Sequence, residues 1–119
     1  MTTREAAAKV GLTDHTLRWY ERIGLLDRIE RGPDGRRRFR EPDLDWLVLL
    51  TRLRSTGMPV AQMLRYAELV RGGSGEADRL ALLEEHRDRV NKLRTELDDC
   101  AAMLDYKIEI YRRAAAERG

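Results

Sequence analysis

The segment over residues 12–26 constrains the fold of this chain more than any other. Its sequence is LTDHTLRWYERIGLL. Thr13 stands where a helix N-cap is needed, apolar residues follow at helical spacing, and Gly24 supplies a stop signal. Polar and cationic residues occupy the other face of the pattern. The segment therefore predicts a short helix that buries one side and presents the other.

A second short helix is predicted directly before it. Thr2 and Glu5 have the spacing of a capping box, alanines follow at helical spacing, and Gly11 ends the run. Two short helices joined by a tight turn form a helix-turn-helix, whose second helix can enter the major groove of DNA. Taken alone, these two helices fit a generic helical hairpin equally well.

The next segment, residues 28–40, favours nucleic acid as the partner. It contains six arginines and two acids around the strong turn signal Gly-Pro-Asp-Gly at residues 32–35. Short runs on either side of the turn can pair as a hairpin. A basic two-stranded wing directly after a helix-turn-helix suits the phosphate backbone beside the groove. A solvated charge run would explain the charge but not the position of the turn.

With these two features the chain resembles the MerR-type transcription regulators. The segment TLRWYERIGLL resembles that family's recognition helix, and GRRRF resembles an element of its wing. LDWLVLLTRLRSTGMPVAQM is similar to its third and fourth helices, and residues 83–111 are similar to the dimerisation helix of its small members. The chain departs from the family at two positions. Arg36 replaces a usual wing Tyr, and Arg40 replaces a usual Ser cap, which leaves Asp43 as the anion available to that helix start.

The resemblance implies both a fold and a function. The fold is mainly α, with a winged helix-turn-helix DNA-binding domain over residues 1–71 and a dimerisation helix over residues 76–117 that forms an antiparallel coiled coil. The function is that of a sequence-specific transcriptional regulator. It would bind palindromic promoter DNA as a homodimer and distort the promoter spacer, with RNA polymerase as a further partner. Such distortion needs many phosphate contacts to offset its energy.

The candidate DNA-binding residues lie in the second helix and in the wing. They are Thr13, His15, Thr16, Arg18, Trp19, Tyr20, Arg36, Arg37 and Arg38. The residues early in the helix are candidates for base edges, because that end of a recognition helix reaches them. The resemblance assigns phosphate contacts to Arg18, Tyr20 and the wing arginines. For Trp19, packing is favoured over contact with the DNA backbone.

Two more helices are predicted after the wing, from Pro42 to Gly57 and from Met58 to the glycines that begin at Gly72. Their apolar positions follow helical spacing and would complete the core under the recognition helix. Trp46, Tyr66 and the methionines could instead line a small-molecule pocket. Core packing is favoured because their spacing needs no further explanation.

Composition narrows the remaining classes of function. Residues 1–71 carry 14 Lys or Arg and 10 Asp or Glu, whereas residues 72–119 carry 9 and 11, so only the first part is basic.

One Cys and two His offer no metal site, and no cofactor motif is present. His86 and Cys100 lie about 21 Å apart along one helix, too far to form a catalytic dyad. We expect no catalytic residues and no enzyme activity. Without an apolar run of about 20 residues or a signal-peptide pattern, a cytoplasmic location is expected.

From residue 76 to about residue 117 neither Pro nor Gly interrupts the helical pattern. Apolar positions three and four apart form a heptad seam with polar interruptions near both ends. The predicted seam residues are Leu83, Val90, Leu93, Leu97, Cys100 and Leu104. A lone helix cannot bury such a stripe, so a second copy of the chain is expected to cover it.

Two questions about this helix stay open at the level of sequence. Cys100 is expected to be an inert seam residue, although a redox-dependent crosslink between two copies would need only that it lie near the dimer axis. A coiled-coil adaptor that binds a protein partner is the alternative function, but it does not explain the basic wing. Neither a small-molecule effector nor an operator is identified by the sequence.

Overall fold

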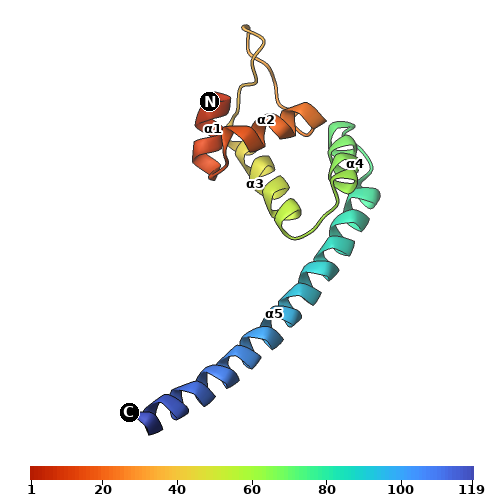
Figure 1. Cartoon of the computed structure of the whole chain (residues 1–119). Helices are drawn as coiled ribbons and strands as arrows, with labels where there is room; N and C mark the ends of the chain where they lie inside the picture. The colour runs from red at the N-terminus through yellow and green to blue at the C-terminus, as the bar shows by residue number, and fades with distance from the viewer. The chain divides into compact units, whose positions relative to one another are not determined.

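The computed structural model describes all residues from Met1 to Gly119. Five helices follow one another along the chain: α1 (Thr3–Val10), α2 (Asp14–Ile23), α3 (Glu41–Ser55), α4 (Val60–Arg71) and α5 (Glu76–Arg118) (Figure 1). The chain divides into two compact units, Met1–Leu83, called the head below, and Glu84–Gly119, called the C-terminal segment. The prediction of a mainly α fold with a long last helix is confirmed.

Local signals set the bounds of α1 and α2. Thr2 and Glu5 form the capping box, with the Glu5 N–H donating to Thr2 Oγ1 at 3.2 Å and the Thr2 N–H donating to Glu5 Oε1 at 3.3 Å. Thr13 caps α2, and Gly24 ends it with a φ of 93°, a conformation that glycine adopts without strain. The predicted helix-turn-helix is therefore present in the head.

The wing, residues 30–38, is a loop that projects from the helices of the head (Figure 1). Its turn is closed by the Gly35 N–H donating to Gly32 O at 3.0 Å and the Gly32 N–H donating to Arg36 O at 2.7 Å. A single antiparallel bridge joins Arg31 and Arg37. The predicted turn is confirmed, but the predicted strands are reduced to this one bridge, beyond which the Arg38 N–H still donates to Glu30 O at 2.9 Å.

The core of the head is formed where α1 packs against α2 and α3, and α3 packs against α4 (Figure 1). Leu17, Leu47 and Leu50 are fully buried there, and each such side chain contributes roughly 1.5–3 kcal/mol to folding. Trp46 donates from Nε1 to Leu25 O at 2.9 Å, and its ring stacks on Tyr66 at 5.9 Å. These aromatic residues are core residues, as favoured from their spacing.

The Asp43 carboxylate lies at the start of α3, as expected from the sequence. The Asp43 carboxylate is 1% exposed and accepts a hydrogen bond from the Arg40 N–H at 2.8 Å. The carboxylate thus satisfies a backbone donor at the start of α3, as expected for the anion available there.

The head includes the first residues of α5. The division between the two units falls after Leu83, not in the glycines at residues 72–75. Leu82 and Leu83 are half-buried and pack against the core of the head. Leu83 thus packs in part within its own chain, and its assignment to the dimer seam stays a prediction.

In the C-terminal segment most of the predicted seam is exposed. Leu97 is 67% exposed and Leu104 is 57% exposed, and Cys100 is also exposed. Val90 and Leu93 are half-buried. A row of large apolar side chains in water is unfavourable, so this face of α5 calls for a covering partner. None of the five helices combines the length and the apolar run required to cross a lipid bilayer.

Candidate nucleic-acid interface

A cleft of about 670 Å³ opens in the head between α1, α2 and the wing. Its walls hold six arginines and three acids, together with a few small and apolar residues. The arginines are Arg4, Arg18, Arg31, Arg36, Arg37 and Arg38, and the acids are Asp14, Glu21 and Asp34. The excess of cationic side chains beside the exposed face of α2 is the electrostatic pattern of a phosphate-binding surface.

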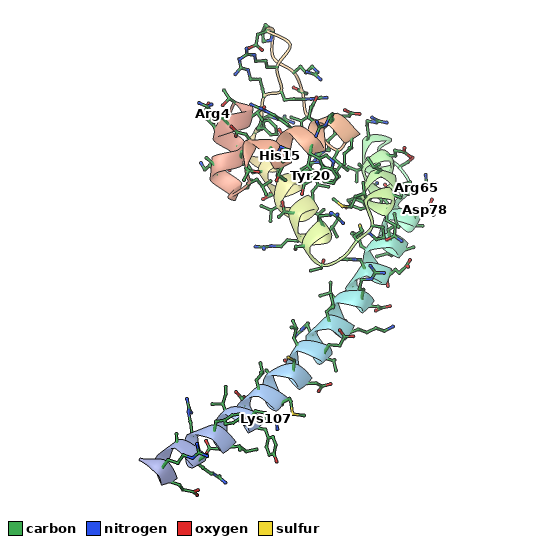
Figure 2. All side chains as sticks on the ribbon, in the orientation of Figure 1. Arg4, His15, Tyr20, Arg65, Asp78 and Lys107 are labelled. Atoms are coloured by element: carbon green, nitrogen blue, oxygen red, sulfur yellow. The ribbon has the colours of Figure 1, made fainter.

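The first turns of α2 supply the residues that can reach base edges. His15, which lies on α2 (Figure 2), and Arg18 are exposed, and Thr16 is half-buried. Thr13 caps α2, because its Oγ1 accepts a hydrogen bond from the Thr16 N–H at 3.1 Å. Thr13 is exposed as well, so the DNA contacts predicted for Thr13, His15, Thr16 and Arg18 all stay predictions.

The two aromatic residues of α2 seat the helix on the core. Tyr20 is 2% exposed, because it lies three positions after the fully buried Leu17 on the same helical face. Trp19 is half-buried and packs against the Tyr20 ring at 5.6 Å. Packing of Trp19 agrees with the prediction. The ring of Tyr20 belongs to the core of the head, and the phosphate contact assigned to this residue stays a prediction.

Two wing arginines present their charge to solvent. Arg36 is exposed and forms no ion pair within the chain. Arg38 is also exposed and pairs with Asp34 at 3.0 Å. The Asp34 carboxylate accepts a hydrogen bond from the Arg36 N–H, and this bond together with the charges of Arg38 and Arg36 lowers the pKa of Asp34. The ionised carboxylate thus holds the tip of the wing in its turn.

Arg37 lies differently from its two neighbours. Its side chain is 11% exposed and bonds Glu21 at 3.1 Å and Asp27 at 3.2 Å. It also donates to Ile29 O at 2.7 Å. The predicted phosphate contact of Arg37 is not supported, because its guanidinium donors are already used within the protein.

The structure adds two arginines to the predicted surface. Arg4 is 87% exposed on α1 and lies 3.9 Å from Asp14 (Figure 2). Arg31 is 51% exposed, pairs with Glu21 and donates to Gly35 O at 2.7 Å. Arg31 belonged to the basic run, so its charge was visible in the sequence. Arg4 could not be found in this way, because only the fold brings α1 to the wall of the cleft.

The structure offers little to a metal ion or to an organic ligand. No group of three or more His, Cys, Asp or Glu side chains is placed to hold a metal ion. A smaller cavity of about 100 Å³ lies between the end of α2 and α4, with Trp46, Asp27 and Arg71 in its walls. This volume is too small for most organic ligands.

A helix-turn-helix with a cationic wing defines a class of nucleic-acid-binding regulators, and comparison with known proteins agrees. Residues 1–68 match the MerR HTH family of regulatory proteins. An HTH-type transcriptional regulator of Haemophilus influenzae is 39% identical over 97% of this chain and 86% of its own length. The HTH-type transcriptional regulator AdhR of Bacillus subtilis is 32% identical over 76% of this chain and 65% of its own length.

Solved structures show the same likeness. The structure of HiNmlR, a MerR family regulator lacking the sensor domain and bound to promoter DNA, has a TM-score of 0.87 and 38% identity, covering 98% of this chain and 89% of that one. A MerR family structure from Listeria monocytogenes has a TM-score of 0.83 and 31% identity, covering 93% of this chain and 85% of that one. This chain belongs to the MerR family of transcriptional regulators.

Proposed function

We propose that this protein is a homodimeric regulator that binds promoter DNA through its head. The exposed face of α2 enters the major groove, and the wing lies on the phosphate backbone beside it. The observation that carries the proposal is the arginine-lined cleft directly next to that face of α2. The likeness to a family member bound to promoter DNA supports it.

The side chains divide between reading and holding the DNA. His15, Thr16 and Arg18 reach base edges from the first turns of α2, because each is a polar residue there that is not buried. The exposed arginines of α1 and the wing bind phosphates and fix the register of the helix in the groove. These arginines are Arg4, Arg31, Arg36 and Arg38.

The dimer is formed by the exposed apolar row of α5. Leu97 lies at the midpoint of this helix. An antiparallel pair centred there brings Leu104 of one copy opposite the half-buried Val90 of the other. The helix has 43 residues and spans about 65 Å at its normal rise. Two heads linked in this way match the two half-sites of a palindromic operator.

A physical link between two heads also suits a regulator that acts by distortion. Binding both half-sites at once bends and untwists the DNA between them, and the phosphate contacts offset this cost. Such a change in the promoter spacer alters how RNA polymerase meets its two promoter elements. Because its target is the chromosome, we place the protein in the cytoplasm. The adaptor alternative is disfavoured by the family and by the cationic cleft of the head.

Fluorescence anisotropy with labelled duplex DNA tests the proposal. DNA selected from a random pool by the full chain, and a scrambled duplex of the same length, are titrated at several salt concentrations. Replacing Arg36 and Arg38 together by Gln is expected to weaken binding to both duplexes by similar factors and to reduce the salt slope by about two. Arg54→Gln is the matched control, because this arginine lies on α3 outside the cleft. Duplex binding without salt dependence, or an equal effect of the control, would contradict the proposal.

A further inference from the structure

A network of ion pairs connects the wing with α2 and α4. Glu21, on the last turns of α2, pairs with Arg37 at 3.1 Å and with Arg31 at 3.0 Å. Asp27, in the loop after α2, pairs with Arg37 and with Arg71, each at 3.2 Å. Three arginines from the wing and the end of α4 are thus joined to the recognition helix through two carboxylates.

Arg37 is the centre of this network. Its guanidinium contacts both oxygens of Glu21 and also donates to Ile29 O at 2.7 Å and Asp27 O at 3.4 Å. The side chain is 11% exposed, the lowest value among the arginines in these pairs. Charge-assisted bonds with several partners at low exposure fix a guanidinium more firmly than a surface pair does.

The backbone alone gives the wing little rigidity. Besides the turn at its tip, only the Arg31–Arg37 bridge and the Arg38 N–H bond to Glu30 O at 2.9 Å join its two sides. A two-stranded ribbon of this kind is at best marginally stable in water. The side-chain contacts of Arg37 therefore supply the main link between the wing and α2.

The geometry points to Arg37 as a positioning residue, which holds the wing at a fixed angle to the recognition helix through Glu21 so that the exposed arginines meet the phosphates together. This inference rests on the proposed DNA-binding function. A wing ordered before binding loses less conformational entropy in the complex, so its phosphate contacts yield more affinity. Arg36, the adjacent residue, is exposed and belongs to the contacts that Arg37 positions.

The effect of neutralising Glu21 on DNA affinity distinguishes between two possible roles of Arg37. Glu21 is an acid in the wall of a cleft that faces DNA, so its charge alone repels phosphate. If Arg37 were a phosphate ligand held back by Glu21, neutralising Glu21 would release it and strengthen binding. If Arg37 positions the wing, neutralising Glu21 loosens the wing and weakens binding, although the surface becomes more positive.

The test compares full-length Arg37→Gln, Glu21→Gln and the double variant, with Arg36→Gln as the matched control. Affinity for DNA selected by the wild type is measured by anisotropy over a range of salt, and thermal unfolding checks that each variant folds. We expect Arg37→Gln and Glu21→Gln each to weaken binding by about three- to tenfold with an unchanged salt slope. The double variant should be no weaker than Arg37→Gln, since the two residues act as one unit. Arg36→Gln should reduce the salt slope by about one.

Amide hydrogen exchange in the wing of the DNA-free protein provides a second readout. Residues 32–38 are expected to exchange faster in Arg37→Gln and Glu21→Gln and to be unchanged in Arg36→Gln. Tighter binding by Glu21→Gln, with a reduced salt slope in Arg37→Gln and unchanged wing exchange, would overturn the inference. If the wild type itself fails to bind duplex DNA, the proposed function fails, while the exchange data still decide whether Arg37 orders the wing.

Discussion

Among single residues, Thr13 shows how a polar side chain at a helix start can be used for folding instead of binding. Its Oγ1 accepts from the Thr16 N–H at 3.1 Å and contacts Thr16 Oγ1 at 3.0 Å. We expect Thr13→Ala to lower the free energy of unfolding by about 0.5–2 kcal/mol and Thr13→Ser to restore it. Chemical denaturation of the three proteins measures this. Unchanged stability in Thr13→Ala, with altered DNA sequence preference, would mean that Thr13 reads bases.

Arg18 and Thr16 are expected to behave in the opposite way. Arg18 is exposed on α2 and has no ion pair that contributes to folding. Replacing either residue by Ala should relax the base preference at particular operator positions, at about 1–3 kcal/mol for each lost contact. Selection of binding sites from a random pool with each variant provides the measurement. An unchanged selected sequence would remove both residues from the reading set.

His86 makes the unfolding of the protein depend on pH. It is 8% exposed, and burial, followed by the charge of Arg89, lowers its pKa from the ordinary value of 6.5. The unfolded chain therefore binds the proton more readily than the folded one, so this group lowers stability as the pH falls below 6.5, until it is protonated in both states. The thermal midpoint should drop more on acidification in the wild type than in His86→Gln. Equal drops in both proteins would contradict this.

Residue roles could be predicted only where local geometry decides them. The caps at Thr2 and Thr13 and the stops at Gly11 and Gly24 follow from neighbours three or four positions away, and they were predicted correctly. The distinction between Arg37 and its neighbours could not be predicted, because it depends on carboxylates 10 and 16 positions away in sequence. The burial of Tyr20 was visible in its spacing from Leu17, but the resemblance favoured another role.

At the scale of elements, α5 performs two tasks along its length. Its start packs on the head through Leu82 and Leu83, whereas Leu104 stands exposed further on. We expect Leu83→Ala to lower the stability of the head by about 1–2 kcal/mol, less than for a fully buried leucine, without changing dimer affinity. Leu104→Ala should instead weaken the dimer by about tenfold.

Thermal unfolding and sedimentation at several concentrations separate these two effects, since only dimer loss depends on concentration. Weaker dimerisation in Leu83→Ala would place this residue in the seam. The sequence could not place the boundary, because the same apolar spacing runs through Leu83 and Leu104 without a break. Heptad spacing indicates which face of a helix is buried but not which partner buries it.

The molecule as a whole combines a head that holds the cationic cleft with a helix that carries the exposed apolar row. The order of the helices and the turn of the wing were predictable, because each rests on a short sequence signal. The outline of the cleft was not, since it forms only when α1, α2 and the wing are packed together. One head alone forms few contacts with DNA, so two linked heads should bind far more tightly than one.

Two copies of the chain are expected to bind one duplex together. Sedimentation of the full chain with a selected duplex, at a protein concentration near the dissociation constant, measures the mass of the complex directly. We expect a complex of two chains and one duplex, with no stable complex that contains a single chain. A complex of one chain and one duplex with the same affinity, or no complex at low salt, would contradict it.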